Sequence, residues 1–112
     1  MLFRSNDKTV LISGVYRTKN VRTENSDTTL LLNDEVLFIS SNPGGSVQVN
    51  LPTAIGNQGK EYYIKRVDTG SSYSVVIDGY GSETIDGALS KTLTNNYEAV
   101  LIISNNSNWF VF

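Results

Sequence analysis

The sequence predicts an all-β protein, an antiparallel β-sandwich of jelly-roll type that follows a separate N-terminal segment. Apolar and polar residues alternate in several short stretches, and polar turn signals separate these stretches at short intervals. No long window repeats apolar residues at i, i+3, i+4 and i+7, so we expect no helix of useful length. A chain of 112 residues is one domain by length.

The strands are expected in this order along the chain: residues 36–40, 46–51, 59–67, 74–78, 97–104 and 108–112. In the second of these, Val47, Val49 and Leu51 point one way, which is typical of a strand with one buried face. Pro52 ends it, because proline has no N–H for the next ladder bond. Turns rich in Gly, Asn, Asp and Ser are expected at residues 42–45, 56–59, 68–71, 78–81, 86–87 and 104–107.

The two C-terminal strands are apolar on both faces, and a sandwich of this size has only one interior. Their second apolar face is covered either by loops of the same chain or by another copy of the chain. The second alternative predicts an oligomer seam formed by Val100, Ile102, Phe110 and Phe112.

Charge divides the chain into two parts. Residues 1–23 hold five basic residues against one acidic residue, a net +4, whereas residues 24–112 hold four against ten, a net −6. We therefore predict an N-terminal arm over residues 1–27, with a strand at 9–16 and a linker at 17–27, and a β-sandwich domain over residues 28–112. The arm should attach the protein to a partner with an acidic surface through Arg4, Lys8, Val10, Ile12, Arg17, Lys19 and Arg22.

The composition argues against catalysis. The chain has no cysteine and no histidine, which excludes disulfides, thiolate or imidazole zinc sites and any Ser-His-Asp triad. We expect neither an enzyme nor a cofactor or metal requirement. No apolar stretch of 18 residues predicts a transmembrane helix, the N-terminus lacks the apolar core of a signal peptide, and no membrane or nucleic-acid partner is expected.

Several short patterns have ordinary structural explanations. Residues 56–60 lack the spacing of a phosphate-binding loop. Asp78 and Asp86 are turn formers, with an irregular calcium site as the alternative. Glu61, Asp68, Asp78, Glu83, Asp86 and Glu98 are most simply surface charges, although a glycosidase pair would need two of them. Tyr80, between two glycines, is expected to be exposed.

Taken as an ordered set, the strands and turns from residue 28 to residue 112 resemble a small β module of tailed-bacteriophage virion proteins. This module occurs on head fibres, capsid decorations and tail-fibre tips. The resemblance implies a non-enzymatic structural protein of the virion, made in the host cytoplasm and displayed on the particle. It also implies a homotrimer that binds other virion proteins, such as a capsid shell or a fibre base.

The short N-terminal stretch before the module favours a capsid decoration or short head fibre over a tail-fibre tip. The alternative is a tail-fibre tip or another receptor-binding or carbohydrate-binding module, for which the partner would be a glycan of the host surface.

Overall fold

The computed structural model describes residues 17–68 and 73–112, and this part of the chain is all-β with no helix. The strands are β1 (Val21–Glu24), β2 (Thr28–Thr29), β3 (Val36–Ile39), β4 (Val47–Asn50), β5 (Glu61–Arg66), β6 (Val75–Asp78), β7 (Ser90–Leu93), β8 (Ala99–Ser104) and β9 (Trp109–Val111). Strands do form at the six expected positions, as β3, β4, β5, β6, β8 and β9. The expected strand at residues 9–16 lies outside the described residues, as does most of the expected turn at 68–71.

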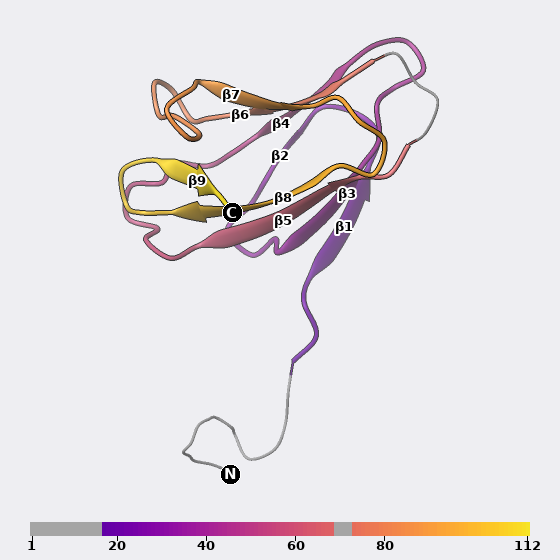
Figure 1. Ribbon diagram of the computed structural model, residues 1–112. Helices are drawn as coiled ribbons and strands as arrows, with labels where there is room; N and C mark the ends of the chain where they lie inside the picture. Colours follow the sequence, from indigo (N-terminus) through magenta and orange to yellow (C-terminus); the bar gives the residue numbers. More distant parts are fainter. Residues whose placement is uncertain (1–16, 69–72) are drawn as a thin grey trace.

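The strands form two sheets that lie face to face (Figure 1). The five-stranded sheet has the order β1-β3-β5-β8-β9, and the four-stranded sheet has the order β2-β4-β6-β7. From β1 to β6 the chain passes from one sheet to the other after every strand. It therefore winds around the space between the sheets, before β7, β8 and β9 add antiparallel strands.

The prediction of an antiparallel sandwich is wrong in this respect, because both sheets are mixed. The pairs β1/β3, β3/β5, β2/β4 and β4/β6 are parallel. A strand that returns to its own sheet after one circuit of the core runs in the same direction as the strand before it. This strand order does not confirm the jelly-roll topology. The sequence shows where strands occur, but not which strands become neighbours.

The core lies between the sheets and is built from the inward side chains of both. Ile39, Ile64 and Ile102 come from the five-stranded sheet, and Val49 and Ile77 come from the other. Each has at most a trace of exposed surface. Burying an aliphatic side chain of this size contributes about 1.5–3 kcal/mol, so this shared layer holds the sheets together.

Two aromatic side chains pack against each other in the core. The rings of Tyr62 and Trp109 lie 5.6 Å apart, and both are buried. The Trp109 indole donates a hydrogen bond to the Pro52 carbonyl oxygen at 3.2 Å, and the Tyr62 hydroxyl donates one to the Leu31 carbonyl oxygen at 2.9 Å. Burial raises the pKa of Tyr62 to about 12. Each ring thus satisfies its polar group while filling the core.

The structure also differs from the expected linker over residues 17–27. Val21–Glu24 forms β1, which pairs in parallel with β3 at the edge of the five-stranded sheet. Thr28–Thr29 forms β2, which pairs with β4. Neither segment is apolar enough to show as a strand in the sequence, because an edge strand needs only ladder hydrogen bonds and a partner of the right register.

Candidate interaction surface

The outward side of the five-stranded sheet, which we call the outer face, is unusually apolar. Strand register aligns two rows of outward residues across it. One row runs Val21, Val36, Tyr63 and Leu101, and the next runs Thr23, Phe38, Lys65 and Ala99. Ile103 and Phe110 form a third pair beside Glu61. Phe38, Tyr63 and Phe110 are each between 36% and 38% exposed, so two large rings lie open on the inner strands β3 and β5 and a third on the edge strand β9.

The outward side of the four-stranded sheet provides a direct comparison within the same molecule. Its outward residues are Thr29 of β2, Gln48 and Asn50 of β4, Val76 and Asp78 of β6, and Ser90 and Thr92 of β7. All but Val76 are polar. A polar outward side is the usual solution for a sheet that faces water. The apolar outer face is therefore a property of one sheet and not of the whole surface.

A groove of about 360 Å³ runs along the outer face between β3, β5 and β8. Phe38, Tyr63 and Leu101 are among the residues that line it, and so are Lys19 and Lys65. The Lys19 ammonium lies 5.0 Å from the centre of the Tyr63 ring, and the Lys65 ammonium lies 5.9 Å from that of Tyr97. These are cation–π distances, so apolar surface and positive charge occur together here.

The predicted oligomer seam needs a correction at two of its four residues. Val100 and Ile102 point into the core of the chain itself, where Ile102 has no exposed surface. The outward residues of β8 are instead Ala99, Leu101 and Ile103. Phe110 and Phe112 are exposed, at 38% and 76%, and the Phe112 amide pairs with the Leu101 carbonyl oxygen. The alternation identified two apolar faces but not which one the second sheet covers.

Sequence reasoning also missed the central part of the outer face, at Val36, Phe38, Tyr63 and Lys65. A signal was present, because residues 36–39 are apolar at every position and Tyr62-Tyr63-Ile64 repeats the pattern in β5. A strand that is apolar on both faces is either covered on both faces or leaves one apolar face exposed.

The predicted docking residues are distributed differently. Arg4, Lys8, Val10 and Ile12 lie outside the described residues. Arg17 is 69% exposed at its side chain and makes a two-pronged contact with the Glu35 carboxylate, at 2.7 and 2.8 Å. The hydrogen bond from Arg17, together with one from the Asn20 backbone N–H, lowers the pKa of Glu35 to about 2. Lys19 joins the outer face, as described above.

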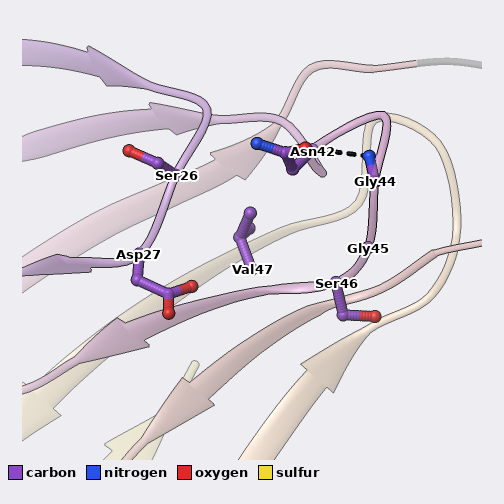
Figure 2. A pocket seen from close by; sticks show the side chains of 7 residues that line it. All are labelled: Ser26, Asp27, Asn42, Gly44, Gly45, Ser46 and Val47. Carbon is purple, nitrogen blue, oxygen red and sulfur yellow. Dashed lines mark hydrogen bonds between the residues drawn. The ribbon is translucent and has the colours of Figure 1, made fainter.

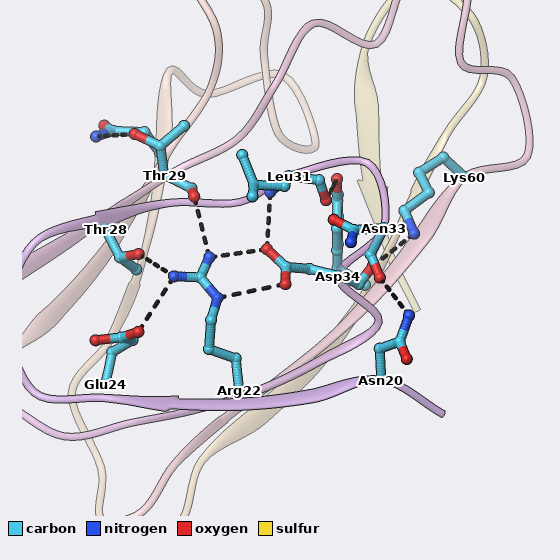
Figure 3. A network of polar contacts seen from close by, with 11 residues as sticks. Asn20, Arg22, Glu24, Thr28, Thr29, Leu31, Asn33, Asp34 and Lys60 are labelled. Atoms are coloured by element: carbon cyan, nitrogen blue, oxygen red, sulfur yellow. Dashed lines mark hydrogen bonds and ion pairs between the residues drawn. The ribbon is translucent and has the colours of Figure 1, made fainter. Parts of the chain in front are cut away.

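Arg22 forms hydrogen bonds that join the edges of the two sheets (Figure 3). Its guanidinium donates to the Asp34 carboxylate at 2.8 Å, to the Thr28 hydroxyl at 2.7 Å and to the Thr29 carbonyl oxygen at 3.0 Å. It also contacts Glu24 at 3.2 Å. Since β1 carries Arg22 and β2 carries both threonines, this network ties the two sheets together beside the core.

The candidate carboxylates have structural partners, except for Asp78 and Glu61. The Glu83 carboxylate accepts hydrogen bonds from the Ala54 N–H and the Thr53 hydroxyl, and Glu98 accepts from the N–H groups of residues 94 and 95. Asp68 pairs with the buried Arg66, and Asp86 accepts a bond from the Val111 N–H. Asp78 has no side-chain bond within the described residues, where no group of three potential metal ligands lies together. Glu61, on the outer face, makes no ion pair in the described segments.

A second concave region is polar and lies between the β1–β2 and β3–β4 loops (Figure 2). It has a volume of about 490 Å³ and is lined by Ser26, Asp27, Asn42, Gly44, Gly45, Ser46 and Val47. Most of its side chains already support the loops. Asp27 accepts from the Gln48 N–H at 2.8 Å, Asn42 accepts from the Gly44 N–H at 2.8 Å, and Ser46 accepts from the Ser74 N–H at 2.9 Å.

Comparisons with known proteins give no family assignment. No protein-family model and no curated protein sequence matches the chain. In the described residues, no helix is long and apolar enough to cross a bilayer. The interpretation of function therefore depends on the surface itself and on the resemblance described above.

Proposed function

We propose that the protein is a non-enzymatic structural protein of a tailed-bacteriophage virion, a capsid decoration or short head fibre displayed on the particle. The observation that carries this proposal is the apolar outer face of the five-stranded sheet, next to a four-stranded sheet with a polar outward side. An exposed apolar patch on a small protein marks an interaction site. Assembly with other protein chains is the activity such a surface supports.

The chemistry of the chain supports the same proposal. It has neither histidine nor cysteine, and the carboxylates of its β body mostly stabilise loops or ion pairs. We further propose that the two-sheet body is a β-sandwich, that three copies assemble, and that the basic N-terminal residues attach the trimer to a capsid shell or fibre base. An acidic partner surface suits the net charge of +4 in residues 1–23.

The direct test is to purify particles of the phage that encodes the chain and to search them by mass spectrometry and electron microscopy. We expect the protein in intact particles, with density on the head. A protein that is abundant in infected cells yet missing from washed particles would contradict a role in the virion. Density at the tail tip would instead support the receptor-binding alternative.

The polar pocket favours that alternative, because Ser26 makes no side-chain hydrogen bond within the described residues and lines the pocket together with other hydroxyl and amide groups. Sugar hydroxyls could hydrogen-bond with such groups. A glycan array with the full chain tests this function. Binding that is abolished by Ser26→Phe, which fills the pocket, but kept by Thr92→Lys on the four-stranded sheet would favour it over a purely structural role.

A further inference from the structure

The outward side chains of β5 form an ordered series across the middle of the outer face. Glu61, Tyr63 and Lys65 alternate with the buried residues of the same strand. An acid therefore lies on one side of a central ring, and a base lies on the other. At about 3.3 Å per residue, Glu61 and Lys65 are about 13 Å apart along the strand.

Glu61 and Lys65 make no ion pair in the part of the chain that the structure describes, although Lys65 approaches the Tyr97 ring. Lys65 lies between Phe38 and Ala99 beside the groove, which Lys19 also lines. Glu61 lies beside Ile103, which pairs with Phe110, so each charge borders apolar surface on at least one side.

When the series of one copy is laid antiparallel to the same series of a second copy, the acid of each copy lies opposite the base of the other. A twofold axis near Tyr63 that reverses β5 places Lys65 of one copy opposite Glu61 of the other. A threefold axis with β5 lying across it places the same two residues head to tail between neighbours. Closed symmetric assemblies of identical chains are the commonest soluble oligomers.

We propose that the outer face is the contact between copies of this chain, with Tyr63 near the symmetry axis and Lys65 of each copy paired with Glu61 of the next. The apolar rows supply the buried surface, and the two charges set the orientation. This inference concerns the contact between copies and holds whatever particle the protein belongs to.

Charge reversal in the full chain tests the pairing. We would measure the mass in solution by sedimentation across protein concentrations for the unmodified chain, for Glu61→Lys, for Lys65→Glu and for the double variant. We expect each single reversal to weaken association at least about tenfold, because like charges then face each other. The double variant again places opposite charges across the contact, so it should recover most of the lost association. Circular dichroism confirms that each variant is folded.

Thr92→Lys provides the control, since it places a new lysine at an exposed position on the outward side of the four-stranded sheet. It should associate like the unmodified chain. Two results would overturn the proposal: an unmodified chain that is monomeric at all concentrations, or a double variant no better than the single ones. If the unmodified chain is a monomer, the outer face is covered by the N-terminal residues of the same chain or by a different protein.

Discussion

Arg66 is fully buried, and its guanidinium reaches the four-stranded sheet. It donates to the Leu93 carbonyl oxygen at 2.8 Å, to the Tyr73 carbonyl oxygen at 2.6 Å and to both oxygens of Asp68. Because Leu93 ends β7 of the four-stranded sheet, this single side chain links the two sheets. The hydrogen bonds and charge of Arg66 hold the pKa of Asp68 far below its usual range.

Replacing Asp68 with Asn should therefore be severely destabilising. It leaves the buried guanidinium without its countercharge, and breaking a buried pair in this way costs about 3–5 kcal/mol. Denaturant unfolding measures the loss. The control is Asp78→Asn, which makes the same chemical change at a partly exposed position with no side-chain bond in the described residues. Equal losses in the two variants would show that the Arg66–Asp68 pair has no special weight.

Glu35 predicts a pH dependence. Its pKa is lowered from 4.5 to about 2 in the folded chain, chiefly by Arg17, so the unfolded chain binds the proton more readily. The stability from this carboxylate is complete above pH about 4.5 and is lost as the pH falls toward 2. At neutral pH the unfolding temperature of Glu35→Gln should be lower than that of the unmodified chain. It should also fall less than that of the unmodified chain as the pH is lowered from about 4.5 to about 2. Parallel curves would contradict this account.

Gly79 predicts a steric effect. A Cβ atom there would lie 2.5 Å from the Glu83 carbonyl oxygen, which is backbone and cannot move aside easily. We expect Gly79→Ala to lower the free energy of unfolding by about 1–3 kcal/mol, the usual cost of forcing extra atoms into a packed site. Gly45→Ala is the control, because its Cβ would meet nothing within 4 Å. A harmless Gly79→Ala would mean that the turn relaxes.

At the scale of elements, β1 shows where the folded body begins. It completes the edge of the five-stranded sheet and carries Arg22, which bonds to β2 and to Asp34. Residues 21–24 thus contribute to the folded body, although they lie within the N-terminal arm predicted over residues 1–27. Arg17 extends this attachment through Glu35.

Two truncations should separate these contributions. A chain that starts at Arg17 keeps β1 and its network, and we expect it to unfold at nearly the temperature of the full chain. A chain that starts at Asn25 loses the β1–β3 ladder and exposes the edge of β3, so its unfolding temperature should fall clearly. Differential scanning calorimetry compares the three chains. If the shorter truncation product were as stable as the longer one, β1 would be dispensable for the fold.

At the scale of the whole molecule, the outward sides of the two sheets differ in polarity. The polar side of the four-stranded sheet suits water, while the apolar outer face of the other sheet suits another protein surface. If copies share that face, folding and association are linked, because the assembled state is stabilised by mass action.

The unfolding temperature of the full chain should therefore rise with protein concentration. A measurement over two orders of magnitude in concentration detects this linkage, since only an associating native state responds. Tyr63→Ala, which removes the central ring of the outer face, should flatten the dependence. Tyr80→Ala, at an exposed turn, should leave it unchanged. An unfolding temperature independent of concentration would argue that the native chain is a monomer.

The sequence by itself determined the all-β class, most strands and the turn at Asp86-Gly87, where both residues have positive φ as an Asp-Gly turn requires. These features follow from local patterns: alternation at period two and residues that tolerate left-handed backbone. It also showed which chemistry the chain lacks, since histidine and cysteine are simply absent.

Tertiary structure decided the parallel pairing of β1, β3 and β5, the membership of β1 and β2 in the sheets, and which apolar side of β8 is core. Val100 and Leu101 are equally apolar in sequence, yet only the position of the second sheet distinguishes them. The physical reason is that register and layer packing join residues far apart in the chain. A strand's own residues indicate that it has two faces, and its neighbours decide what each face meets.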